Sequence, residues 1–117
     1  MINLGGDADS LRVEGQEHTA VYRATIERDG KQMQSEHQRT FCIRCGSHLW
    51  ALNDRWPDLV HPVASAIDSP LPPPPQHVHM MVGSKAPWVR VEGVADDLRF
   101  EEYPEESLAA WHEKHGF

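Results

Sequence analysis

FCIRCGSHLW, the stretch from Phe41 to Trp50, decides how the rest of the chain is interpreted. It holds the only two cysteines of the chain, Cys42 and Cys45, and Gly46 follows them directly. Two thiolates at this spacing can bind one zinc ion from a tight turn, and glycine supplies the positive φ angle that such a turn often needs. The stretch therefore predicts half of a tetrahedral zinc site, in a knuckle that joins two strands.

Outward from this turn the sequence has the patterns of β-structure. Residues 19–26 alternate between apolar and polar, and the Asp29-Gly30 pair that follows is a strong hairpin signal. Residues 33–41 should form the returning strand, and their polar character predicts an edge or half-exposed position. A helix is expected from Pro104 onward. The predicted fold class is mainly β, with small twisted antiparallel sheets around a zinc-knuckle-like turn and one C-terminal helix.

Length and composition narrow the function classes. The 117 residues suit a single domain, 1–117, in which residues 68–75 form a stiff proline-rich connector. A net charge of −7 argues against nucleic acid as a direct partner. The apolar runs are too short to cross a membrane, and nothing resembles a secretory signal. Two cysteines make no disulfide framework, so we expect a reducing compartment, the cytoplasm.

The cysteine pair has three interpretations. Cys42 and Cys45 can be zinc ligands, a thioredoxin-like redox pair, or two thiols that bind no metal. The redox interpretation needs a helix that begins at the motif, because a helix N-terminus lowers the pKa of a thiol. Residues 46–52 lack a helical pattern, which makes this interpretation the weakest. The absence of a second cysteine pair from the sequence favours the third interpretation.

Histidines could complete the site. His77 and His79 stand two apart on an expected strand, 77–82, so both side chains should point to one face. With the cysteines they could form a Cys₂His₂ site if the strands are neighbours, although histidines on a partly wet sheet surface are the more common case. His48 lies beside the knuckle and could hydrogen-bond a cysteine sulfur.

Several motifs together resemble those of one family. The chain resembles the glutathione-dependent formaldehyde-activating enzymes, a family that also contains centromere protein V. The similarity covers essentially the whole chain, and the order of the motifs is more specific than the cysteine pair alone. The matching stretches are RTFCIRCGSHL (39–49), SAIDSP (65–70), SKAPWV (84–89) and the tail 101–117.

This resemblance implies a β-rich zinc fold like that of the suppressor-type guanine nucleotide exchange factors. It also implies carbon–sulfur lyase chemistry, the condensation of glutathione with formaldehyde or a related thiol-adduct reaction. A full family member carries a Cys-x-Cys motif near its start, which joins the later pair in a structural Cys₄ zinc site. A further Cys-x-Cys-x-x-Cys segment holds the zinc associated with catalysis.

The chain departs from the family pattern because both N-terminal cysteine motifs are absent. By the resemblance, Cys42 and Cys45 match the structural zinc pair, and no residue matches a catalytic ligand. Catalytic and glutathione-binding residues therefore stay unassigned. Either the chain corresponds to the C-terminal two-thirds or more of a family domain, or its branch has discarded the zinc chemistry. The abrupt opening at residues 1–6 favours truncation.

Two functions follow as hypotheses. The first is a zinc-dependent carbon–sulfur lyase with glutathione as co-substrate. The second is a non-catalytic β-module, with or without metal, that acts by binding or assembly. Loss of N-terminal strands would leave a bare sheet edge, which invites pairing. We therefore expect a homodimer, a small-molecule thiol adduct as ligand, and no nucleic-acid or membrane partner.

Overall fold

The computed structural model describes residues 1–93 and 95–116, and the chain forms two compact units, Met1–Pro70 and Leu71–Phe117. The boundary falls in the proline-rich segment expected to act as a connector. The single-domain prediction stays a prediction, and each unit is described by itself.

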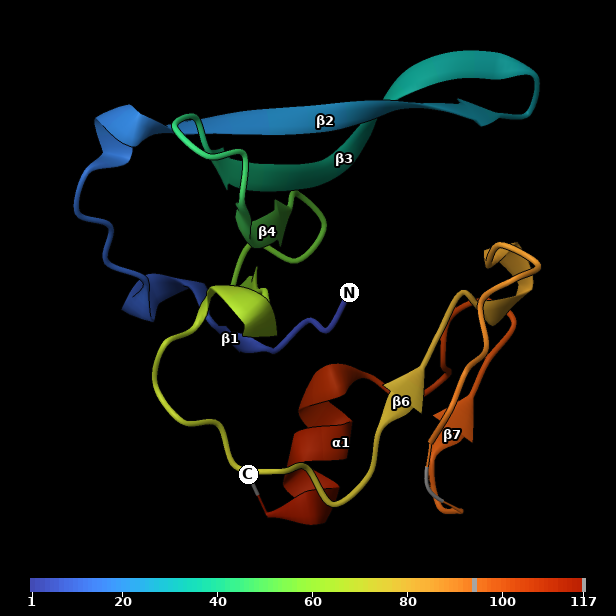
Figure 1. Ribbon diagram of the computed structural model, residues 1–117. Helices are drawn as coiled ribbons and strands as arrows, with labels where there is room; N and C mark the ends of the chain where they lie inside the picture. The colour runs from blue at the N-terminus through green and yellow to red at the C-terminus, as the bar shows by residue number, and fades with distance from the viewer. Residues whose placement is uncertain (94, 117) are drawn as a thin grey trace. The chain divides into compact units, whose positions relative to one another are not determined.

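The first unit is a five-stranded antiparallel sheet (Figure 1). Its strands run in the order β1-β5-β4-β3-β2, so β1 and β2 form the edges. Three short 3₁₀ helices lie in its connections: Ala8–Ser10, Gln16–His18 and Ala64–Ala66. The strand bounds are β1 Gly6–Asp7, β2 Thr19–Arg28, β3 Lys31–Cys42, β4 His48–Asn53 and β5 Leu59–Pro62.

The expected hairpin is confirmed. Strands β2 and β3 are joined at Asp29 and Gly30, whose φ angles are +54° and +71°. Two successive positive φ angles are typical of the tight hairpin turn that Asp-Gly favours. Of the two positions expected for the returning strand, the half-exposed one is confirmed and the edge is not, because β3 pairs with both β2 and β4. Its polar side chains instead reflect that most of β3 is half-exposed or exposed.

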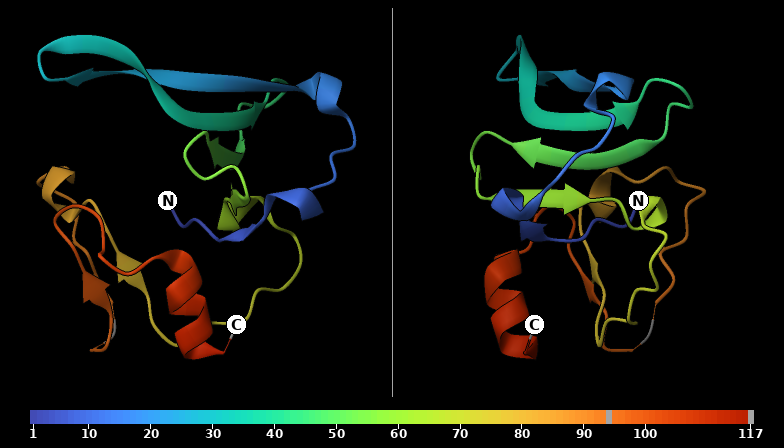
Figure 2. Two further views of the ribbon diagram at one scale, coloured as in Figure 1. Left: turned by 180° about the vertical axis from the view of Figure 1, so that it is seen from behind. Right: turned by 90° about the vertical axis from the view of Figure 1, so that its left-hand side faces the viewer.

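The β2–β3 hairpin is longer than the rest of the sheet (Figure 2). β4 pairs with β3 only over residues 37–41, so the part of the hairpin beyond them has no third strand. We call residues 25–34 the hairpin arm. Every residue of this arm except Ile26 is exposed.

The described residues that are buried as a whole, backbone and side chain together, all belong to the first unit. They are Thr40, Ala51, Val60 and Val63, each with less than a tenth of its surface exposed. They come from β3, β4, β5 and the residue after β5. The core therefore runs along the middle strands of the sheet, next to the turn that holds the cysteines.

The second unit has little regular structure. Strands β6 (Val78–His79) and β7 (Leu98–Arg99) form a parallel pair, the 3₁₀ helix Val82–Ser84 follows β6, and helix α1 spans Leu108–His115. The helix begins after Ser107, whose hydroxyl oxygen accepts from the Ala110 N–H at 3.1 Å, and not at Pro104 as expected. It ends at Gly116, with φ +77°.

The architecture confirms a mainly β fold with a small antiparallel sheet and one C-terminal helix. Among the described helices, none has the length and apolar character needed to cross a membrane.

Candidate functional site

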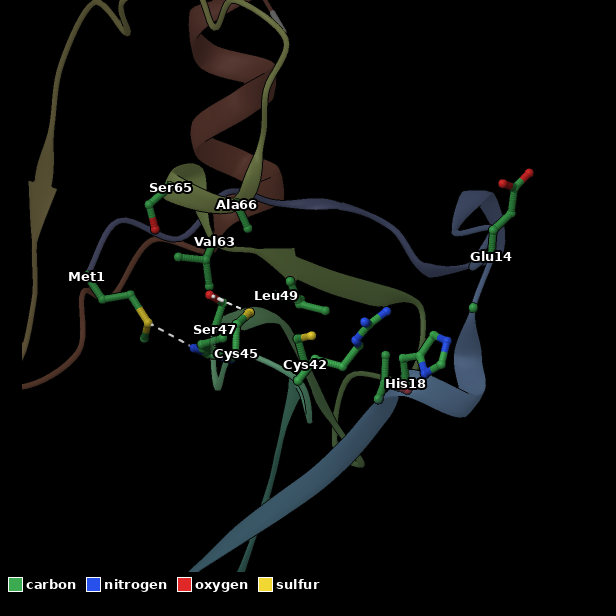
Figure 3. A pocket seen from close by; sticks show the side chains of 14 residues that line it. Met1, Glu14, His18, Cys42, Cys45, Ser47, Leu49, Val63, Ser65 and Ala66 are labelled. Atoms are coloured by element: carbon green, nitrogen blue, oxygen red, sulfur yellow. Dashed lines mark hydrogen bonds between the residues drawn. The ribbon is translucent and has the colours of Figure 1, made fainter.

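The cysteines lie in the turn between β3 and β4. Cys42 ends β3, and its N–H donates to the Ser47 carbonyl oxygen at 2.9 Å. The Gly46 N–H donates to the Cys42 carbonyl oxygen at 2.7 Å. Gly46 has φ +75°, in the left-handed region that glycine adopts without steric cost. These contacts bring the chain back on itself, so that both thiols line one cavity (Figure 3).

Cys45 is the more accessible thiol. Its side chain is exposed, whereas Cys42 is half-buried, and both are free. The Sγ of Cys45 lies 3.2 Å from the Ser47 Oγ, in a hydrogen bond drawn in Figure 3. The pKa of Cys45 is lowered, chiefly by the Ser47 hydroxyl, then by the Ser47 backbone and the Cys42 thiol, while slight burial opposes the shift. A hydrogen bond to the thiolate favours the charged form.

An open cavity of about 730 Å³ lies beside this turn. This falls within the roughly 300–1,000 Å³ that small-molecule sites occupy. Its charged and titratable side chains come from the turn, from the first residue of β4 and from the segment before β2, and most of the other lining side chains are small or apolar. The lining residues are Met1, Glu14, Gly15, His18, Thr19, Cys42, Arg44, Cys45, Ser47, His48, Leu49, Val63, Ser65 and Ala66.

His48 does not contact a cysteine as the sequence suggested. Its Nε2 lies 3.1 Å from the Trp50 carbonyl oxygen, and its Nδ1 lies 3.2 Å from the Met1 sulfur. The carbonyl oxygen and the thioether sulfur both only accept, and the carbonyl oxygen is the stronger acceptor, so we assign the ring hydrogen to Nε2. This bond fixes the imidazole at the cavity wall, with Nδ1 toward Met1.

The described residues do not complete a zinc site. Within 1–93 and 95–116, no three histidine, cysteine, aspartate or glutamate side chains are arranged to hold a metal ion. Cys42 and Cys45 supply two thiolates, and a structural zinc site has four ligands. Cys42 and Cys45 belong to the first unit and His77 and His79 to the second, so the suggested Cys₂His₂ site stays a prediction.

His77 and His79 instead contact a buried carboxylate in the second unit. Asp97 has a side chain with no exposed surface, and its Oδ1 accepts from the His77 backbone N–H at 2.9 Å and lies 3.0 Å from His77 Nδ1. Its Oδ2 lies 3.4 Å from His79 Nε2. Sequence reasoning missed Asp97, whose nearest neighbour in the sequence is another aspartate, Asp96. The signal that could have found it is the expected position of both histidines on one face of a strand.

Comparison with known proteins gives one informative match. The chain is 53% identical, over 115 residues, to a protein of Halomonas elongata named "Putative glutathione-dependent formaldehyde-activating enzyme". The alignment covers 98% of this chain and 71% of that relative. No family model matches the chain. No solved structure matches it either.

Proposed function

Because the chain belongs to the glutathione-dependent formaldehyde-activating enzyme family, we propose that it takes part in forming the adduct of glutathione and formaldehyde. The observation that carries this proposal is the 53% identity over 98% of the chain. The reaction class is that of a carbon–sulfur lyase, operating here in the direction of bond formation.

The reaction needs little covalent chemistry from a protein. The glutathione sulfur, as thiolate, attacks the formaldehyde carbon and forms the carbon–sulfur bond. The π electrons of the carbonyl move to its oxygen, which then takes up a proton. Holding the two reactants together removes most of the entropic cost of a bimolecular step. A protein that binds glutathione and supplies a proton can therefore accelerate the reaction.

The cavity beside the knuckle has features that suit this task. Glutathione carries two carboxylates, and Arg44 brings a guanidinium to the cavity, the group that binds carboxylates in a bidentate manner. His18 lines the same cavity, and its Nε2 lies 3.4 Å from a Glu17 carboxylate oxygen. An imidazole in this setting can exchange a proton with a bound substrate. We assign glutathione binding to Arg44 and proton exchange to His18.

The second part of the proposal concerns zinc binding by the two cysteines. The family resemblance gives Cys42 and Cys45 the role of zinc ligands, and the turn presents both thiols at the cavity. They would supply two of the four ligands of a tetrahedral site, and the described residues bring no three metal-binding side chains together. The steps above therefore rest on the cavity side chains alone. We propose the pair as zinc ligands that share the ion with groups outside the described residues.

A non-catalytic β-module is the alternative. It is favoured by the incomplete metal site of the described residues, since a module that works by binding needs no catalytic metal. The two functions differ in one measurable property. An enzyme accelerates adduct exchange, whereas a module binds glutathione or a protein without changing that rate.

Exchange spectroscopy tests the proposal. Glutathione and formaldehyde also combine without a catalyst, so magnetisation transfer between free and adduct signals should be measured with and without the protein. We expect faster exchange with the protein, and a higher glutathione requirement in Arg44→Ala. Arg90→Ala is the matched control, because Arg90 is exposed and does not line the cavity. Exchange that stays at the uncatalysed rate would favour the module.

Metal analysis tests the zinc proposal separately. We expect zinc to copurify with the protein and to be lost from the double variant Cys42→Ser, Cys45→Ser. Equal zinc content in the two proteins would remove the cysteines from the ligand set and leave the glutathione proposal intact.

A further inference from the structure

Strand β2 is a long edge. It spans ten residues, Thr19–Arg28, and among the described residues its only neighbour is β3. Its other side carries the backbone N–H and C=O groups that every edge strand leaves unpaired. Natural proteins shorten such edges, cover them, or interrupt them with proline or a bulge. β2 is not short, and it contains no proline.

The irregularity in the hairpin lies on β3 and leaves β2 continuous. Arg23 pairs with Gln38, and Thr25 pairs with Gln34. One residue of β2, Ala24, therefore stands opposite residues 35–37 of β3. The extra residues bulge from the inner strand, so the outer edge of β2 keeps a regular backbone along its length.

Pairing of this edge with another strand would stabilise the hairpin arm. Among the described residues, the strand segments 25–28 and 31–34 pair only with each other, and a two-stranded ribbon is marginally stable in water. Near the base of the arm, Val21 and Tyr22 each expose 54% of their surface. Apolar side chains at an open edge are unusual, because edge strands usually carry charges that discourage pairing.

The charges of β2 are self-complementary in one antiparallel register. In a continuous sheet, directly opposite residues of two antiparallel strands lie on the same face. Two copies of β2 can be related by a two-fold axis perpendicular to the sheet. One residue of β2 must then lie at the axis, directly opposite the same residue of the second copy. With Arg23 or Glu27 there, like charges would oppose each other. With Thr25 there, Arg23 of each copy lies opposite Glu27 of the other.

The same register places the remaining side chains favourably. It brings Tyr22 opposite Arg28, a pair that can form a cation–π contact. It also brings Ala24 opposite Ile26, the two β2 residues in this region that are half-buried and apolar. Arg23 already donates through both terminal nitrogens, to Asp54 at 2.9 and 3.3 Å, and its Nε is directed to neither of these bonds. The guanidinium also donates to the Ser35 carbonyl oxygen of β3 at 3.3 Å, so in the dimer Arg23 would share its charge between Asp54 and Glu27 of the second copy.

We propose that β2 is the dimer interface of this protein, where it pairs in antiparallel fashion with β2 of a second copy and Thr25 lies on the two-fold axis. The two five-stranded sheets then form one continuous sheet. The partner is a second copy because the charge pattern of β2 complements itself. This inference does not depend on the proposed chemistry, and it specifies the surface and the register of the homodimer expected from the sequence.

Sedimentation velocity and hydrogen exchange test the proposal together. The protein should be a dimer at high concentration, and the amides of residues 19–28 should exchange more slowly as concentration rises. In the Glu27→Arg variant, Arg23 of each copy would face an arginine at position 27 of the other copy. This like-charge contact occurs twice in each dimer and should weaken association about tenfold or more. Glu92→Arg makes the same charge change at an exposed residue of the second unit and should leave association unchanged.

Cross-linking tests the register. Thr25→Cys places two thiols on the axis, and oxidation should give a disulfide-linked peptide that joins position 25 of one copy to position 25 of the other, as identified by mass spectrometry. Val21→Cys should give no such self-linked peptide. A monomer at every concentration would overturn the proposal. So would a dimer whose residues 19–28 gain no protection, or whose Thr25→Cys variant does not cross-link to itself. Concentration-independent protection of β2 would identify an intramolecular occupant and overturn it equally.

Discussion

Each of the two units of the chain is stabilised internally by a different kind of interaction. In the first unit, backbone ladders join five strands, and the buried residues Thr40, Ala51, Val60 and Val63 form its core. In the second unit, β6 and β7 have two residues each, and the described residues buried as a whole all lie in the first unit. Polar contacts connect its segments instead. His77 and His79 meet Asp97, and the Trp111 indole N–H donates to Gln76 at 3.1 Å.

This difference predicts different sensitivities. A sheet distributes its stability over many backbone bonds and a few apolar contacts, so it should resist the loss of any one surface side chain. A unit that relies on a buried carboxylate should respond strongly to changes at that carboxylate. The first unit also carries the candidate site, which places the proposed chemistry on the better-supported part of the chain.

The largest effect should follow from a charge in the core of the first unit. Ala51 is completely buried in β4, so Ala51→Asp would bury a carboxylate without a partner. We expect a loss of about 4 kcal/mol or more in the free energy of unfolding, enough to unfold many small domains. Urea titration followed by circular dichroism measures it. Ala109→Asp, at an exposed position in the first turn of α1, should change stability little. Equal losses in the two variants would refute the assigned core.

The next largest effect should appear in the second unit. Asp97→Asn keeps the shape of the side chain but removes the charge that His77 and His79 contact. Because hydrogen bonds to charged groups contribute about 1.5–3 kcal/mol, we expect a loss of about 2 kcal/mol in the opening free energy of β6 and β7. Native-state hydrogen exchange of residues 77–79 and 98–100 measures it. Asp96→Asn is the control, since Asp96 is exposed. Unchanged exchange would show that apolar contacts hold this unit.

The sequence predicted the local features and missed the distant ones, for physical reasons. Asp29-Gly30 and the turn at Gly46 depend on backbone angles that glycine and its neighbours determine, so both are visible in short stretches. The position of β3 depends on β4, which the polarity of β3 does not encode. Asp97 lies eighteen and twenty residues from its histidine partners, and no local pattern joins them.

A moderate effect should separate backbone strain from thiol chemistry within the first unit. Gly46 and Gly30 both have positive φ angles, and a Cβ at either would meet no atom within 4 Å. Substitution by alanine at either position should therefore lower the free energy of unfolding by about 1 kcal/mol, from backbone strain alone. Only Gly46→Ala should also change the rate at which Cys45 reacts with iodoacetamide. A changed thiol rate in Gly30→Ala would mean that the hairpin and the cysteine turn are coupled.

A smaller effect should follow from Ser47→Ala. The Ser47 hydroxyl is the largest cause of the lowered pKa of Cys45, so its loss should raise that pKa toward the ordinary value. The pH dependence of alkylation, measured in a Cys42→Ser background, should then shift to higher pH. Ser65→Ala is a suitable control, because Ser65 lines the same cavity. The same shift in both variants would indicate a general change in the cavity.

The smallest effect should be a pH dependence confined to the first unit. The pKa of His37, in β3, is lowered from 6.5, chiefly by burial and then by Arg39, His61 and His48. Burial disfavours the charged imidazole, so the unfolded chain binds its proton at a higher pH than the folded chain does. The contribution of His37 to stability is therefore complete above pH 6.5 and decreases as pH falls below it toward the folded pKa. His37→Gln should make the free energy of unfolding less dependent on pH in this range, as measured by urea titration at several pH values. Hydrogen exchange should place the change in β3 and β4, because His37 lies opposite Asn53 of β4. If the change appeared instead in residues 77–100, the pH dependence of stability would arise in the second unit. Its histidines, and not His37, would then be the groups that titrate on unfolding.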